Sequence, residues 1–504
     1  MGSVAGKTRL PRLRKFRGST AVRCLVMLAV CGGQSCVAFG PEMAVADDIE
    51  AARRQLKADY AEQFGKFSAM LQGQGRRDLA AEVDQWLPRT GPYQLALFTR
   101  RHVETISDGP VKDAGLLRFA MLRRQQAAAI FKLARRAAAE GRAAVAVSLA
   151  METLRADPAH RAAAAALGLK QHDGRLRSGG ELRQLRAGRV WHERFGWLPE
   201  DHVARYEDGQ RYYNGRWVTA QQEARLRSNI ARGWKVETEH FSVTTNHRLE
   251  AGVALAARLE QFYDVWWQLF AGFHLTGDEL QQMFDRGTQP RRNRRLHQVV
   301  YFRDRAEYAA ALKKMQPGVE GTLGIYFGDV RTAYFFAGQG QDPGTIFHEA
   351  AHQLFQESRP AKPIVALRDN FWMVEGIACY LESLQLTKSC ALVGGLDHGR
   401  VPAARVRLLK DGFYVPFVET VAMGSRDVQR DPRIRTLYSQ FAGQAAFLMH
   451  ADGGRYRDAV SRYLQAIYRG GAKPETLARA TGSDYGDLDV GYREFLRGAA
   501  AASQ

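Results

Sequence analysis

The stretch GTIFHEAAHQLFQES, residues 344–358, holds two histidines four positions apart, with a glutamate directly after the first. Asp342 and Pro343 come just before it. An aspartate can cap the free amide groups of a helix start and proline suits the first helical position, so we expect a helix to begin here. On that helix His348 and His352 lie one turn apart on the same face. Two imidazoles need this spacing to bind one metal ion.

A second stretch supplies a third ligand. FWMVEGIACYLES begins at Phe371, and its apolar first half contains Glu375. A carboxylate buried on such a helix needs a partner, and a metal ion would be one. His348, His352 and Glu375 form a donor set that suits Zn²⁺ and leaves a fourth position for water. Glu349 would act as general base on the zinc-bound water. The alternative is a helix with a structural pair of histidines.

The two motifs also resemble a known group. The pattern His348-Glu349-x-x-His352 followed by WMVEGIACY is similar to the gluzincin metallopeptidases of the peptidase-MA-like group. Residues 236–470 resemble a family of exported bacterial proteins of unknown function within that group. The resemblance implies a gluzincin or thermolysin-like core with a mixed sheet, a zinc ion on the three ligands named above, and a catalytic glutamate.

The resemblance carries further expectations. A strand near Tyr326–Phe336 would form the edge of the cleft, where an extended peptide could add as a further strand. Tyr438, in YSQFAGQ, would steady an oxyanion; the other interpretation is a half-buried helix tyrosine. Relatives often carry an acidic residue near the position of Cys379, where it holds the first histidine. Here Glu382, Asp369 or a backbone carbonyl would have to make that contact.

The first 46 residues differ from the rest. A basic segment, KTRLPRLRKFR, precedes the apolar stretch CLVMLAVCGG, and a small-x-small site ends at Ala46. This pattern predicts a secretory signal peptide and export to the periplasm or the extracellular space. A lipid anchor on Cys31 is less favoured, because LAV is a poor lipoprotein box. No later segment is long and apolar enough to span a bilayer. Removal of the signal leaves Cys379 and Cys390, which could form one disulfide.

The remaining chain reads as an α+β protein. Helical periodicity dominates first, and one helix is similar to a tetratricopeptide-type helix, although no 34-residue period supports an array. Asp-Gly and Asn-Gly pairs then predict tight hairpins. Mixed strands and helices follow, and VETEHFSVTTN, residues 236–246, alternates like one strand. The expected regions are a helical N-terminal region (47–169), a hairpin-rich connector (170–235), a metallopeptidase-like core (236–425) and a C-terminal helical lobe (426–504).

The net charge of the chain bears on which classes of partner it can bind. The formal net charge is +19, carried by arginine spread thinly over the chain. No aromatic–basic module accompanies it, so we expect no nucleic-acid binding. The expected function is zinc-dependent hydrolysis of a peptide or protein substrate. The N-terminal helices would be either an inhibitory segment or a docking module for an envelope protein. The alternative function is a catalytically weak or inactive zinc-containing binding module of the cell envelope. We expect six other histidines to be structural or at the surface: His240, His247, His274, His297, His398 and His450.

Overall fold

The computed structural model describes residues 43–105, 113–290, 295–339 and 342–501. Most of the predicted signal peptide, 1–46, therefore lies outside the described residues. Its last four residues already belong to the first helix, α1 (Met43–Gly73). Within the described part of the chain, no helix is both long and apolar enough to cross a membrane.

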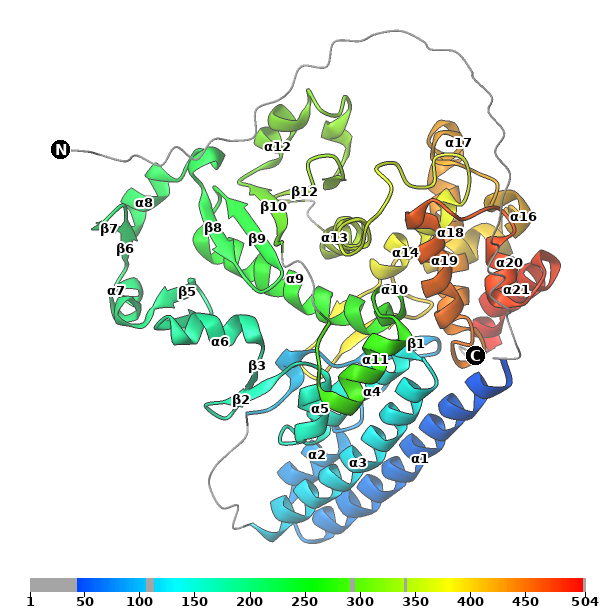
Figure 1. Ribbon diagram of the computed structural model, residues 1–504, viewed down its shortest axis with the longest axis horizontal. Helices are drawn as coiled ribbons and strands as arrows, with labels where there is room; N and C mark the ends of the chain where they lie inside the picture. Colours follow the sequence, from blue (N-terminus) through cyan, green and yellow to red (C-terminus); the bar gives the residue numbers. More distant parts are fainter. Residues whose placement is uncertain (1–42, 106–112, 291–294, 340–341, 502–504) are drawn as a thin grey trace.

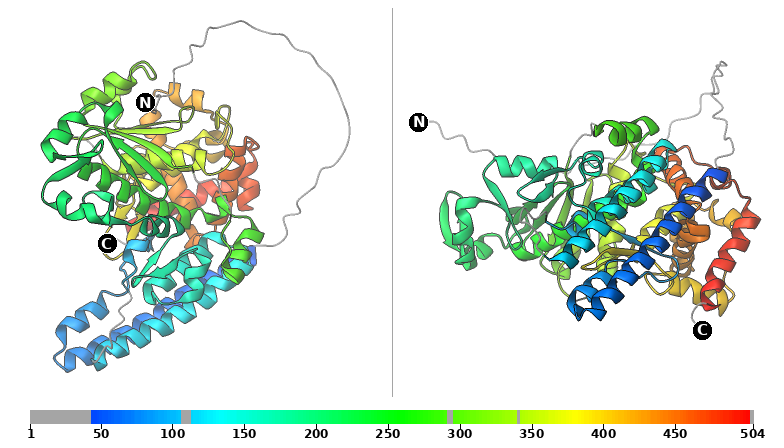
Figure 2. Two further views of the ribbon diagram at one scale, coloured as in Figure 1. Left: turned by 60° about the vertical axis from the view of Figure 1, so that its left-hand side comes forward. Right: turned by 90° about the horizontal axis from the view of Figure 1, so that it is seen from below.

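Helices make up most of the N-terminal region, which extends to one side of the molecule (Figures 1 and 2). Gly141 and Asp157 fall at helix breaks, as the sequence predicts. The region is not purely helical, however: a short strand, β1, pairs antiparallel with β14, far along the chain. Four residues are too few to show a periodicity, so the sequence pattern missed this strand. The elements are α1, α2 (Arg77–Asp84), β1 (Gln94–Leu97), η1 (Arg100–His102), α3 (Ala114–Ala139), α4 (Ala143–Ala156) and α5 (Arg161–Ala166).

Three hairpins, each followed by a short helix, form the connector. Asp173 and Asn214 have φ of 48° and each precedes a glycine of positive φ, the geometry that tight hairpins with Asp-Gly and Asn-Gly turns require. These two predicted hairpins are confirmed, and a third lies between them. The elements are β2 (Lys170–His172), β3 (Arg175–Arg177), α6 (Gly179–Arg186), β4 (Arg189–His192), β5 (Gly196–Pro199), η2 (Glu200–His202), α7 (Val203–Glu207), β6 (Gln210–Tyr213), β7 (Arg216–Thr219), α8 (Ala220–Leu226) and η3 (Ile230–Arg232).

A five-stranded mixed sheet of order β11-β12-β10-β9-β8 supports the site. The three inner strands are parallel, and the two edge strands run antiparallel to their neighbours. The segment VETEHFSVTTN, expected to be one strand, is instead split between two strands, because the chain reverses after Glu237. The strands are β8 (Trp234–Glu237), β9 (Phe241–Thr245), β10 (His297–Phe302), β11 (Ile325–Phe327) and β12 (Thr332–Phe336).

Helices cover both faces of this sheet. On β12, Phe335 packs into the main core with α9 (Leu249–Leu269) and α13 (Pro343–Glu357). The next residue, Phe336, points to the other face and packs with α12 (Arg305–Leu312). Alternation along the strand thus separates two cores. Three short helices complete this part: α10 (Ala271–His274), α11 (Gly277–Arg286) and η4 (Val319–Gly321).

The C-terminal part is helical apart from the small sheet β1-β14-β13. Figure 1 shows α13 between the large sheet and the pair α14 and α18. Every residue of α14 is buried. A Cβ atom on Gly376 would lie 2.7 Å from the carbonyl oxygen of Phe441, so glycine lets α14 and α18 approach closely. The elements are α14 (Phe371–Leu381), β13 (Gln385–Leu386), β14 (Ala391–Gly394), α15 (Val401–Leu409), α16 (Phe417–Thr420), α17 (Ser425–Arg430), α18 (Ile434–His450), η5 (Ala451–Gly453), α19 (Arg457–Arg469), α20 (Thr476–Thr481) and α21 (Tyr485–Ala501).

The N-terminal and C-terminal regions are connected to the large sheet by a shared core, and to each other by an ion pair. The main core draws residues from β1, the large sheet and the C-terminal helices. The Arg142 guanidinium at the start of α4 pairs with Asp458 on α19 at 2.7 Å. The expected α+β class, with a mostly helical N-terminal region before a mixed sheet, is confirmed.

Candidate metal centre

The three predicted ligands converge between α13 and α14. The Nε2 atoms of His348 and His352 are 3.1 Å apart. The Glu375 Oε2 atom lies 3.5 Å from the first of these nitrogens and 3.7 Å from the second. His348 and Glu375 are buried, whereas His352 is half-buried. The sequence prediction therefore named three side chains that the fold brings together.

These separations can be compared with what zinc needs. Zn–N and Zn–O bonds are about 2.0–2.2 Å in proteins, so ligand atoms at two corners of a tetrahedron lie about 3.3–3.6 Å apart. The three observed distances, 3.1, 3.5 and 3.7 Å, bracket that range. Two imidazoles and one carboxylate are also the donor types that zinc accepts. The residues present fit a zinc ion.

Local structure holds the two helices in place. α13 begins at Pro343, as expected, although the Asp342 side chain makes no capping hydrogen bond. α14 begins after Asn370, whose backbone is left-handed with φ of 59°. The Asn370 amide N–H donates to the carbonyl of Val421 at 2.8 Å, and its side chain accepts from the Tyr463 hydroxyl. These contacts orient the start of α14 so that Glu375 faces α13.

A second layer of contacts orients His348. Its Nδ1 atom is 2.9 Å from the Glu382 Oε1 atom, and the other oxygen of Glu382 accepts from Arg400 Nε at 2.8 Å. A carboxylate on Nδ1 fixes the imidazole tautomer and leaves Nε2 for a metal. The sequence had left Glu382 and Asp369 open for this role. The structure favours Glu382, because Asp369 accepts from Asn370 instead.

Cys379 lies close to the same histidine without replacing the carboxylate. Its Sγ atom is 3.9 Å from His348 Nδ1. His348, Cys379 and Glu382 could form a second donor group by distance alone. Burial raises the pKa of the Cys379 thiol, however, and metals bind the thiolate. Cys379 and Cys390 are both buried free thiols, so the disulfide that the sequence allowed is not formed.

The charges of the cluster depend on each other. Burial alone would lower the pKa of His348, but hydrogen bonds to Cys379, Glu375 and Glu382 outweigh it and raise that pKa well above its usual value. Burial would raise the pKa of Glu375, yet the two imidazoles hold it well below its usual range. Glu375 therefore stays ionised, which is the form that binds a metal.

Glu349 reaches from α13 to the edge strand of the large sheet. Its Oε2 atom accepts a hydrogen bond from the backbone N–H of Tyr326 in β11 at 2.8 Å. The Tyr326 hydroxyl donates to Glu357 at 3.1 Å. Glu357 lies about two turns after Glu349 on α13. Two carboxylates of α13 thus hold the edge strand through Tyr326, one at its backbone amide and the other at its side-chain hydroxyl. Glu357 and Arg400 were not foreseen, because nothing in their local sequence distinguishes them from surface charges.

Tyr438 approaches the cluster from α18. Burial raises the pKa of its hydroxyl, and a hydrogen bond to Glu375 raises it further. The hydroxyl therefore remains protonated and can donate. The Arg400 guanidinium lies 5.9 Å from the centre of the Tyr438 ring. The structure thus brings all five predicted site residues into one neighbourhood formed by α13, α14 and α18.

Comparison with known proteins adds no relative to this picture. No protein-family model matches the chain, and no curated protein matches its sequence.

Proposed function

We propose that the protein is a zinc-dependent metallopeptidase with a gluzincin-like core. The observation that carries the proposal is the cluster of His348, His352 and Glu375, whose donor atoms are spaced as a tetrahedral zinc site requires. Glu349, the residue after His348, supports hydrolysis over a purely structural metal, because a structural site needs no further carboxylate beside its ligands.

A bound zinc ion would polarise a scissile carbonyl and acidify a water molecule. The residues of the chain supply the rest. Glu349 takes the proton of the attacking water and passes it to the leaving amine. Tyr438 has a protonated hydroxyl beside Glu375, and it can turn its single O–H from that carboxylate to the oxygen that gains negative charge. Glu382 and Arg400 keep His348 oriented.

The edge strand supports a peptide as the substrate. Among the described residues β11 pairs with β12 alone, so its other side is an edge of the sheet. An extended peptide can add to such an edge through main-chain hydrogen bonds. The Tyr326 amide, now bound to Glu349, belongs to this strand. A peptide lying along β11 would therefore have its carbonyl groups close to the general base.

Export is part of the proposal. The signal-like residues 1–46 would direct the protein to the periplasm or the extracellular space. There, peptide and envelope-protein substrates are available.

Metal analysis and peptide cleavage together test the proposal. We expect about one zinc per chain in the purified protein, lost in His348→Ala and Glu375→Ala and retained in Glu349→Gln. The last variant should lower kcat/KM on a cleaved library peptide by ~100-fold or more, the usual contribution of a general base. His398→Ala, an exposed histidine outside the cluster, is the control and should change neither.

Two results would contradict the proposal at different points. Absence of zinc from the gently purified wild-type protein would remove the metal site. Stoichiometric zinc without cleavage of any library peptide, or cleavage that Glu349→Gln leaves unchanged, would instead favour a zinc-containing binding module.

A further inference from the structure

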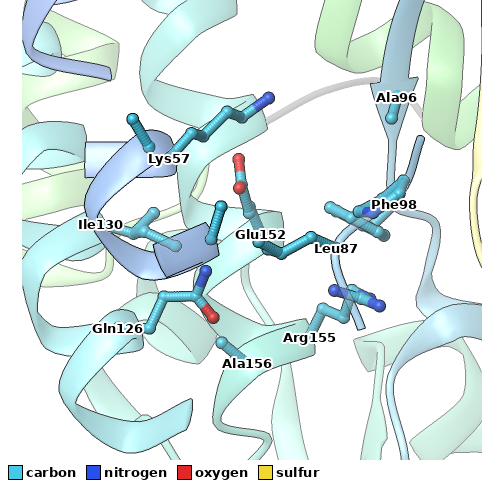
Figure 3. A pocket seen from close by; sticks show the side chains of 12 residues that line it. Lys57, Leu87, Ala96, Phe98, Gln126, Ile130, Glu152, Arg155 and Ala156 are labelled. Carbon is cyan, nitrogen blue, oxygen red and sulfur yellow. The ribbon is translucent and has the colours of Figure 1, made fainter. Parts of the chain in front are cut away.

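A cavity of about 320 Å³ lies in the helical N-terminal region, and its lining includes none of His348, His352 and Glu375. Its walls come from α1, α3 and α4, from the segment after α2, and from β1 (Figure 3). Leu87, Phe98 and Ile130 give it an apolar lining. Pockets of this size that combine apolar walls with a few convergent polar groups are typical of small-molecule sites.

One buried cation lines the cavity without a directly paired carboxylate, although the charge of Glu152 acts on it from a greater distance. Arg155 is only 8% exposed. Its guanidinium carbon lies 3.8 Å from the centre of the Trp86 ring and 4.4 Å from that of Phe98, and one nitrogen donates to the Trp86 carbonyl at 2.6 Å. Among the residues that the structure describes, no carboxylate lies within 4.0 Å of it. Burial lowers the pKa of Arg155 to about 10, so the side chain is charged at neutral pH.

A buried charge without a hydrogen-bonded counter-charge is unfavourable, because the protein interior solvates it poorly. The aromatic rings beside Arg155 offset part of this penalty through cation–π contacts. They cannot replace a hydrogen-bonded anion, since a guanidinium has five N–H donors. The position therefore favours a ligand that brings its own carboxylate.

The other polar groups of the cavity add to this preference. The Gln126 Oε1 atom accepts from Trp86 Nε1 at 3.0 Å, which leaves its amide nitrogen as a donor. The one acidic side chain in the lining, Glu152, already pairs with Arg53 at 3.2 Å. Lys57 stands at the exposed rim and also belongs to the lining. The lining therefore contains two cations, Arg155 and Lys57. Its one carboxylate, that of Glu152, is paired with Arg53, which is not part of the lining.

We propose that this cavity binds a small monocarboxylate with a compact apolar body. The carboxylate pairs with Arg155, the Gln126 amide donates beside it, and the apolar body packs on Leu87, Phe98 and Ile130. A phosphate group fits less well, because a doubly charged anion would meet one buried cation and the nearby Glu152 carboxylate. The site is independent of the candidate metal centre and of the proposed peptidase activity.

Binding of two acid and amide pairs tests the proposal. The probes are octanoate with octanamide, and N-acetyl-leucine with N-acetyl-leucinamide, titrated into the purified protein by calorimetry. The first pair represents a free fatty acid, and the second represents the C-terminal residue of a peptide. We expect at least one acid to bind at least tenfold more tightly than its amide, because the amide cannot form the charged hydrogen bonds. The tighter acid identifies the source of the carboxylate.

Two variants locate the binding. Arg155→Met keeps the length of the side chain and removes its charge, and it should abolish the preference for acid over amide. Arg124→Met, on the exposed side of α3, is the matched control and should bind as the wild type does. Ala58→Trp changes only the exposed rim and should block both acids even if Arg155→Met does not fold.

Three outcomes would overturn the proposal: neither acid binds the wild-type protein, acids and amides bind equally, or a folded Arg155→Met protein keeps the preference. Undiminished binding to Ala58→Trp would likewise place the ligand elsewhere.

Discussion

On the proposed zinc site, removal of the Glu382 carboxylate should weaken zinc binding although Glu382 is not one of the three proposed ligands. The side chain holds His348 Nδ1 at 2.9 Å and is itself only 12% exposed. Hydrogen bonds to charged groups in such surroundings contribute about 1.5–3 kcal/mol. Arg400, the other partner, is 40% exposed and can be solvated once Glu382 is gone. Its release should add little to the loss.

The expected effect of Glu382→Ala is therefore a loss of about 2 kcal/mol in zinc binding, or roughly 30-fold in affinity. Glu382→Gln should fall between wild type and alanine, because an amide oxygen still accepts from the imidazole. Competition of the metal-free proteins against a chromophoric chelator measures the affinities. Glu419→Ala, an exposed glutamate of α16, serves as the control. An affinity within threefold of wild type in a folded Glu382→Ala protein would refute the reasoning that this contact orients the ligand.

Three further outcomes follow from the structure. A chelator should lower the Tm of the wild-type protein, because zinc at 100 times its Kd adds about 2.7 kcal/mol of stability; His348→Ala should show no shift, and an equal shift in both would count against the site. Burial alone would raise the pKa of Glu260, but His240 and Arg100 hold it at about 2 instead of 4.5. Its contribution is present above pH 4.5 and is lost as the pH falls toward 2, so unfolding free energy should drop by something on the order of 3 kcal/mol, and less in Glu260→Gln, in acid denaturation curves. Gly376→Ala should destabilise the protein by about 1–2 kcal/mol in urea unfolding, because the clash with α18 exceeds the gain in helix propensity; unchanged stability would mean that the two helices separate freely.

Local sequence patterns predicted many of the helices and hairpins of this fold. The Asp-Gly and Asn-Gly pairs predicted their hairpins because few other residues adopt the backbone those turns need. The helices with long apolar periodicity appeared where expected, including the two that carry His348, His352 and Glu375. The three candidate ligands could be named because helical spacing places His348 and His352 together, and because an acidic residue in an apolar helix such as Glu375 needs a partner.

Contacts between distant segments were beyond the same reasoning. β1 was missed because its pairing with β14 depends on residues far along the chain. The division of VETEHFSVTTN into two strands depends on sheet order, which alternation does not encode. Arg400 and Glu357 act through partners on other elements. The cavity around Arg155 is likewise assembled from several helices, so no short motif announces it.

The small sheet that joins β1 to β14 has a consequence for how the protein is made. Its two strands are separated by roughly three hundred residues of chain, and pairings across such distances form slowly. During synthesis the N-terminal helices emerge first, while the edge of β1 must wait for its partner. An unpaired strand edge is prone to aggregation. A newly made chain therefore passes through an interval in which it is vulnerable, and that interval ends only when residues 391–394 have been added.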